Sequence, residues 1–216
     1  MSNAADIGKV SAKGGFNVLW GLVISSIVSA VGVIFIAQLL GEDAYGLYTI
    51  ALTAPNLILI FRDWGITYAM IRFTAKYRAE GRMDEVRSVI FAGLVFELAS
   101  GVVLSLISFT LSDYIAGTIF NRPAIAPLMQ IASFYILASA IITAASATFT
   151  GLERMALNSV MNICLSIVKT GLIIGLVLLG FGTQGAVIGL TGANFIAGLV
   201  GIALLFSIYR TLPKPF

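Results

Sequence analysis

The sequence predicts an all-α integral membrane protein, built as a bundle of six transmembrane helices. Of its 216 residues, 59% are hydrophobic and 11% are charged, and the mean hydropathy is +1.01. A helix needs about 20 apolar residues to cross about 30 Å of hydrocarbon, and six stretches of that length are separated here by short polar segments. We therefore divide the chain into an N-terminal segment (1–16), a transmembrane region (17–209) and a C-terminal segment (210–216).

The expected spans begin and end where polar or charged residues interrupt the apolar runs. They are residues 17–40, 45–73, 86–111, 124–150, 157–181 and 186–209. Pro55 lies inside the second span, where it removes a backbone hydrogen bond and predicts a kink. Pro123 suits the first turn of the fourth span, and residues 113–120 before it predict a helix in the membrane interface.

On the sixth span a small residue recurs every four positions, and small residues let two membrane helices approach closely. These residues are Gly185, Gly189, Ala193, Ala197 and Gly201. We expect this face to pack against another helix.

The basic residues predict the orientation. Ten Lys and Arg residues fall on one side of the six spans, and Arg122 alone falls on the other. The ten are Lys9, Lys13, Arg72, Lys76, Arg78, Arg82, Arg87, Arg154, Arg210 and Lys214. By the positive-inside rule, both termini are cytoplasmic in a multi-pass protein of the plasma membrane, and the 41–48 turn places Tyr45 and Tyr48 in the outer interface. The 72–87 segment is expected to contact anionic lipids of the inner leaflet.

The residue types argue against several functions. The chain has no histidine, so it lacks the usual general base and the commonest metal ligand. Cys164 is its single cysteine, which prevents an intramolecular disulfide. The net charge of +3 is small and gives no indication of nucleic-acid binding. We expect no enzyme activity, no cofactor and no metal.

Four charged residues lie deep within the spans, away from their ends: Arg62, Asp63, Glu97 and Lys169. A charge at the centre of a membrane helix costs roughly 2.5–3.5 kcal/mol, so these side chains should face protein or water. Counted at about 1.5 Å per residue, all four share a layer near the middle of the membrane. Arg62 and Lys169 would there form a cationic point suited to phosphate, while Asp63 and Glu97 would bind a coupling cation. The alternative is that the four charges pair without any function.

Polar residues accompany these charges at helical spacing and predict a water-filled cavity. The residues expected to line it are Asn56, Thr143, Asn158, Asn162 and Ser166. The alternative is that they form hydrogen bonds that hold helices together.

Three segments carry a resemblance to a known family. They are IAQLLGEDAYGLYTI (36–50), FRDWGITYAMIRFTAKYRAEGR (61–82) and FTGLERMALNSVMNI (149–163). They resemble the Wzx-type polysaccharide or oligosaccharide flippases, which share a superfamily with the multidrug MATE exporters. Members are built from two lobes, and this chain resembles the N-terminal lobe alone. Its end is therefore expected to lead into a second lobe of the same chain, or two copies are expected to pair.

The resemblance implies that the chain moves a polyprenyl-(pyro)phosphate-linked oligosaccharide across the membrane, by alternating access through a cationic central cavity. Its partners would be the lipid-linked substrate, membrane lipids and glycan-assembly enzymes. The alternative is a MATE-like, ion-coupled exporter of amphipathic or cationic small molecules, for which Asp63 and Glu97 matter more than the basic groups. Two further alternatives are a membrane enzyme acting on polyprenyl phosphates and a structural partner in glycan assembly.

Overall fold

In a computed structural model of the chain, residues 4–62 and 64–211 are described, and they form helices and short connections without any strand. Side chains are described for residues 19–20, 22–62 and 64–210. The α-helices are α1 (Ala4–Ile60), α2 (Ile66–Ala79), α3 (Met83–Tyr114), α4 (Ala126–Gly151), α5 (Met155–Leu176) and α6 (Gly182–Thr211). The shorter elements are the π-helices η1 (Ile115–Ile119) and η3 (Val177–Phe181) and the 3-10 turn η2 (Pro123–Ile125). The prediction of an all-helical protein is confirmed.

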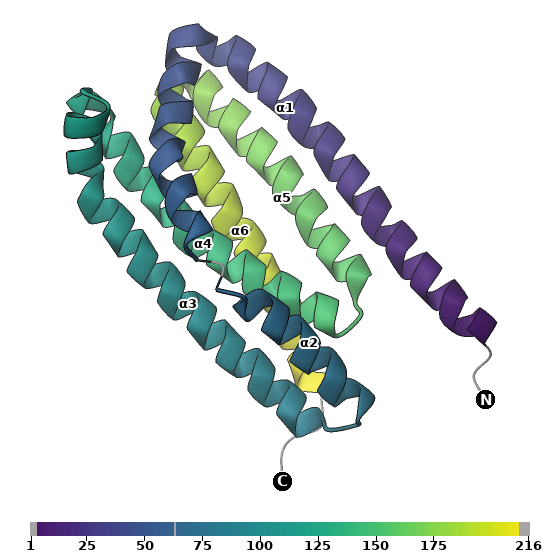
Figure 1. The fold of residues 1–216 in the computed structure, drawn as a ribbon. Helices are drawn as coiled ribbons and strands as arrows, with labels where there is room; N and C mark the ends of the chain where they lie inside the picture. Colours follow the sequence, from purple (N-terminus) through teal and green to yellow (C-terminus); the bar gives the residue numbers. More distant parts are fainter. Residues whose placement is uncertain (1–3, 63, 212–216) are drawn as a thin grey trace.

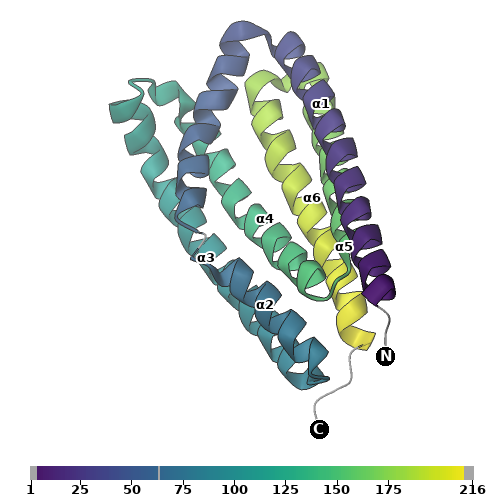
Figure 2. The ribbon, with the colours of Figure 1, turned by 45° about the vertical axis from the view of Figure 1, so that its right-hand side comes forward.

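Two glycine-dependent reversals shape the bundle. Gly41 has φ 75° and ψ 172°, a backbone conformation that is essentially restricted to glycine. Figure 1 shows the chain turning back there, so that α1 consists of two arms, residues 4–40 and 42–60. A second reversal, at Gly180 (φ 91°) and Gly182 (φ 51°), leads into α6. The start of α1 and the end of α6 therefore lie at the same end of the bundle (Figures 1 and 2).

Four stretches of the described residues are long and apolar enough to cross a bilayer. They are Leu22–Ile60, Met83–Ile119, Pro123–Gly151 and Met155–Arg210. The first and the last each contain one of the two glycine reversals. Large apolar side chains point outward along the bundle, for example Phe61 at 71% and Leu179 at 74% exposure. Such an exterior suits contact with lipid rather than with water.

The helices pack mainly in the pairs α3 with α4, α1 with α5, and α6 with both α4 and α5. The predicted small-residue face of α6 is confirmed, because all five of its residues are buried. A Cβ added to Gly189 would lie 2.9 Å from the Cα of Ile173 in α5, and one added to Gly201 would lie 2.9 Å from the sulfur of Met161. This face is therefore where α5 approaches α6 most closely.

The second expected span is not one continuous helix. α1 ends at Ile60 and α2 begins at Ile66, so helical structure within residues 45–73 is interrupted at 61–65. The N–H groups of Phe61 and Arg62 donate to carbonyls three residues earlier, at 3.0 and 3.1 Å, which closes the helix with a tight final turn. Gly65, with φ 80°, is the N-cap of α2. At Pro55, which is buried within α1, the backbone keeps helical geometry.

The residues predicted to form an interfacial helix, 113–120, are helical as far as Ile119 but do not form a separate helix. α3 continues to Tyr114 and passes directly into η1, which ends at Ile119. Ala116 is buried in a cluster with Ile125 and Met129 at the start of the next helix. This packing holds the segment as an extension of α3.

The basic turns gather at the end of the bundle where α1 begins and α6 ends (Figure 1). Arg78 of α2 donates to the carbonyl of Leu152 at 2.7 Å and pairs with the Glu153 carboxylate at 3.0 Å. It thereby fixes the turn between α4 and α5, where Glu153 has φ 55°. In the α2–α3 turn, hydrogen bonds from the Arg82 guanidinium hold the pKa of Glu85 below its ordinary value.

Candidate functional site

Arg62 lies in the interruption after α1 and is surrounded by polar groups of two other helices. One of its terminal nitrogens, Nη1, donates to Ser139 Oγ at 2.8 Å, and the other, Nη2, donates to Thr143 Oγ1 at 2.7 Å. Both hydroxyls belong to α4. The third nitrogen, Nε, lies 3.7 Å from Glu97 Oε2 of α3. Every nitrogen of the guanidinium therefore faces a protein acceptor.

The Arg62–Glu97 pair lies inside the bundle, with side-chain exposures of 13% and 4%. Thr67 Oγ1 of α2 donates to Glu97 Oε1 at 3.5 Å, a marginal hydrogen bond. Two of the four charges expected within the spans are thus paired with each other. Asp63, the third, lies outside the described residues, and its expected role in ion coupling stays a prediction.

Lys169 of α5 lies in a different group. Its Nζ donates to Ser29 Oγ at 3.3 Å, and Ser29 in turn donates to Ser166 Oγ at 3.3 Å. Ser29 lies on the first arm of α1, and Ser166 lies one turn before Lys169. Within the described part of the chain, no hydrogen bond or ion pair joins Lys169 to the Arg62 group.

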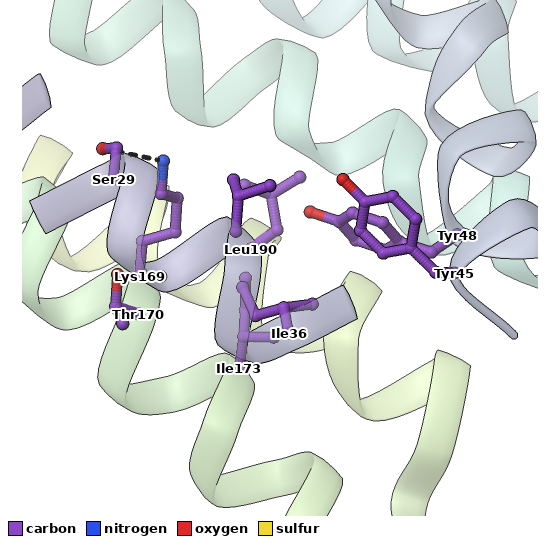
Figure 3. Close-up of a pocket in the computed structure, with 10 residues that line it drawn as sticks. Ser29, Ile36, Tyr45, Tyr48, Lys169, Thr170, Ile173 and Leu190 are labelled. Carbon is purple, nitrogen blue, oxygen red and sulfur yellow. Dashed lines mark hydrogen bonds between the residues drawn. The ribbon is translucent and has the colours of Figure 1, made fainter. Parts of the chain in front are cut away.

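A cavity of about 60 Å³ opens beside Lys169, between the two arms of α1, α5 and α6. Its polar wall consists of Ser29, Tyr45, Tyr48, Lys169 and Thr170, and its apolar wall includes Val33, Ile36, Ile173 and Leu190. Figure 3 shows the two tyrosine rings at one end of the cavity with their hydroxyls directed toward Leu190, while Lys169 and Ser29 lie at the other end. Among the described residues, no carboxylate lines this cavity.

None of the five cavity residues expected from the sequence is among the residues that line this pocket, although Ser166 accepts a hydrogen bond from Ser29 of its wall. Ser146 Oγ and Asn162 Nδ2 both donate to Asn158 Oδ1, at 3.0 and 3.3 Å, so this group links α4 to α5. Asn56 is exposed on the second arm of α1. Among the described residues, no group of three His, Cys, Asp or Glu side chains is placed to hold a metal ion.

Sequence reasoning missed the roles of Ser29, Tyr45 and Tyr48. The tyrosines follow the turn at Gly41 and were expected in the outer interface, but both line the pocket. Their spacing of three residues places them on one face of the second arm, with ring centroids 5.9 Å apart. The sequence could have indicated the pocket through this spacing, because tyrosines that only anchor a helix in the membrane interface need not lie on the same face of it.

Comparison with known proteins identifies the fold. A family model described as "Polysaccharide biosynthesis protein" matches residues 11–216. An uncharacterized membrane protein of Methanocaldococcus jannaschii is 31% identical over 78 residues, which are 36% of this chain and 15% of that protein.

Among solved structures, a MATE protein in a bent conformation has a TM-score of 0.79 at 14% identity, covering 98% of this chain and 48% of that one. An inward-facing multidrug resistance MATE family transporter of the MOP superfamily has a TM-score of 0.76 at 14% identity, covering 88% and 47%. The bundle thus has a MATE-like fold, and the chain spans less than half the length of these structures.

Proposed function

Because the chain belongs to the polysaccharide biosynthesis protein family, we propose that it moves a polyprenyl-(pyro)phosphate-linked oligosaccharide from the cytoplasmic to the outer leaflet. The chain is a multi-pass protein of a membrane transporter family, and the lipid-linked oligosaccharide is the substrate that we propose for it. No covalent step is involved: the phosphate is held by protein cations while the sugar crosses and the lipid tail stays in the bilayer.

The observation that carries the proposal is a lysine held inside an apolar bundle beside a hydroxyl-lined cavity. Among the described residues no carboxylate pairs with this ammonium, and such a charge costs free energy that a purely structural helix bundle would avoid. An anionic group of a lipid-linked substrate offsets that cost when it binds. Arg62, which was nominated together with Lys169, already has three protein acceptors. We therefore assign the primary phosphate contact to Lys169 and a secondary one to Arg62.

We further propose that the chain crosses the membrane six times with both ends in the cytoplasm, as one lobe of a two-lobe transporter. Support comes from the reversals inside the two longest apolar stretches and from the basic turns at the end shared by α1 and α6. The second lobe would be a further part of the same protein or a second copy of the chain.

Labelling of single cysteines in intact cells tests this topology. In a Cys164→Ser background, Glu80→Cys and Thr118→Cys place one thiol at each end of the bundle, and both positions are exposed. An impermeant maleimide should label position 118 and should spare position 80 until the membrane is opened. Labelling at both positions in intact cells would contradict the topology.

Reconstitution into vesicles tests the transport function directly. A fluorescent polyprenyl-pyrophosphate oligosaccharide should become accessible on the opposite leaflet only in vesicles that contain the protein. A hydrogen bond to a charged group contributes about 1.5–3 kcal/mol, so Lys169→Ala should slow flipping roughly 10- to 150-fold. Lys76→Ala is the matched control, because Lys76 is exposed and pairs with Glu80. Equal rates for Lys169→Ala and the control would remove the assigned phosphate role.

The second candidate function is ion-coupled export of amphipathic or cationic small molecules. Two observations favour it: the fold resembles multidrug resistance MATE family transporters, and the bundle buries the carboxylate of Glu97, which pairs with Arg62. Under this function Glu97→Gln should abolish the uptake of an organic cation driven by a sodium or proton gradient, and Lys169→Gln should have little effect. A protein that takes up no organic cation under either gradient but flips the lipid-linked oligosaccharide supports the flippase.

A further inference from the structure

We infer that the cavity beside Lys169 is a binding site for one phosphate group, with Tyr45 and Tyr48 as its neutral hydrogen-bond donors. The inference deepens the proposed function, because it assigns the phosphate of the carrier to one pocket and separates it from the Arg62 group. It also identifies the pocket's chemistry without depending on the sugar that is carried.

The donor inventory of the pocket supports an anion. An ammonium has three donors, and within the described part of the chain Lys169 uses one of them, on Ser29 Oγ. Ser29 donates its own hydroxyl proton to Ser166 Oγ. Two N–H donors of Lys169 therefore remain for a ligand.

The hydroxyl groups add to this set. The hydroxyls of Tyr45 and Tyr48 point into the cavity from its other end (Figure 3). Of the described residues that line the pocket, Lys169 alone carries a formal charge, and that charge is positive. Cationic and hydroxyl donors around a small space favour an oxyanion over a metal cation.

The size of the cavity limits the ligand. One water needs roughly 10–15 Å³ of such space, so a volume of about 60 Å³ corresponds to about four to six water-sized positions. A phosphate group, with a central phosphorus and four oxygens, matches that size, whereas a sugar ring does not. The pocket therefore holds the phosphate and leaves the glycan outside it.

Thermal stabilisation by phosphate probes tests the site. The purified protein would be unfolded in detergent with increasing inorganic phosphate, and in nanodiscs with and without a polyprenyl monophosphate, with chloride as the comparison anion. A ligand that binds the folded state raises the unfolding temperature in proportion to its concentration over its Kd. We expect phosphate to raise it and chloride at equal ionic strength to have no such effect. Equal stabilisation by chloride would overturn the assignment to phosphate.

Matched variants assign the effect to the pocket. Lys169→Gln keeps a donor for Ser29 but loses the charge and should weaken phosphate binding at least about tenfold. Tyr45→Phe should weaken it roughly threefold to tenfold, and it provides a second test if Lys169→Gln fails to fold. The controls are Lys76→Gln and Tyr114→Phe, which change exposed residues outside the pocket. Phosphate stabilisation that survives in both pocket variants, or that is absent from the unmodified protein in both settings, would overturn the site.

Comparing inorganic phosphate in detergent with polyprenyl monophosphate in nanodiscs also distinguishes the source of the phosphate. Stabilisation by polyprenyl monophosphate alone identifies the headgroup of a lipid carrier, whereas equal stabilisation by inorganic phosphate identifies a free ion. Flipping assays keep this inference separate from the proposed function. If the protein binds phosphate through Lys169 but does not flip the lipid-linked oligosaccharide, the phosphate site is supported and the proposed flippase function is refuted. If it flips the substrate but shows no such phosphate binding, the function is supported and the site is refuted.

Discussion

Removing the carboxylate of Glu97 while keeping its shape should destabilise the protein strongly. In Glu97→Gln, the guanidinium of Arg62 stays inside the bundle with its hydroxyl partners Ser139 and Thr143 but without its counter-charge. At the observed separation of 3.7 Å, the attraction is about 4.5 kcal/mol for an effective dielectric constant of about 20. Breaking one partner of a buried pair typically costs about 3–5 kcal/mol. For a protein of this length that corresponds to an unfolding temperature lowered by roughly 6–20 °C.

Circular dichroism during heating in detergent would measure this change. Glu80→Gln is the control, because it removes an exposed carboxylate from the α2–α3 turn. The double variant Arg62→Gln/Glu97→Gln should be more stable than Glu97→Gln alone, because it also removes the charge left without a partner. If the losses of the two single variants simply add in the double variant, Arg62 and Glu97 do not interact and the reasoning is refuted.

Three further predictions concern packing and charge. A Cβ at Gly32 would collide with the side chain of Thr170, so Gly32→Ala should lower the unfolding temperature. Adding Thr170→Ala to that variant should restore part of the lost stability. If it restores none, the contact between residues 32 and 170 is not the cause of the loss. Gly189→Ala should separate α6 from the α5 backbone and cost about 1–3 kcal/mol in thermal unfolding, whereas an unchanged stability would contradict the close approach. The pKa of Glu85 is lowered by hydrogen bonds from Arg82, so the stabilisation they give is present above the ordinary carboxyl pKa and is lost as pH falls through the lowered value. In Arg82→Ala, the carboxyl resonance of Glu85 followed by ¹³C NMR should titrate at a higher pH, and an unchanged titration would show that Arg82 is not responsible.

The parts of the fold that the sequence predicts well are those where one local signal decides. Pro123 marks the turn before α4, and the four-residue spacing of glycine and alanine on α6 identifies the buried face. Each of these depends on residues within one or two helical turns. Hydrophobic length and loop charge likewise need no knowledge of neighbours, which is why the fold class and the basic end of the bundle follow from the sequence.

The interruption at residues 61–65 and the pocket could not be predicted in this way. The apolar run continues on both sides of Arg62, so hydropathy gives one long span where the structure has two helices. The interruption becomes stable only because hydroxyls of α4 and the carboxylate of α3 meet the guanidinium. Similarly, Tyr45 lines the same cavity as Lys169 of α5 only because the chain reverses at Gly41. Both features depend on which helices become neighbours.

Arg62 and Lys169, the two cations inside the bundle, make different contacts, so their substitution should affect stability and transport differently. Arg62 holds α3 and α4 to the end of α1 through two hydroxyl groups and a buried counter-charge, so replacing it breaks an ion pair inside the bundle. Lys169 has two N–H donors that no described residue uses, so a ligand can bind to it without breaking its hydrogen bond to Ser29. Arg62→Gln should therefore lower thermal stability and transport together, whereas Lys169→Gln should lower transport at nearly unchanged stability. Measuring both quantities for both variants separates a structural cation from a ligand-binding one, and a large loss of stability in Lys169→Gln would place Lys169 in the structural class as well.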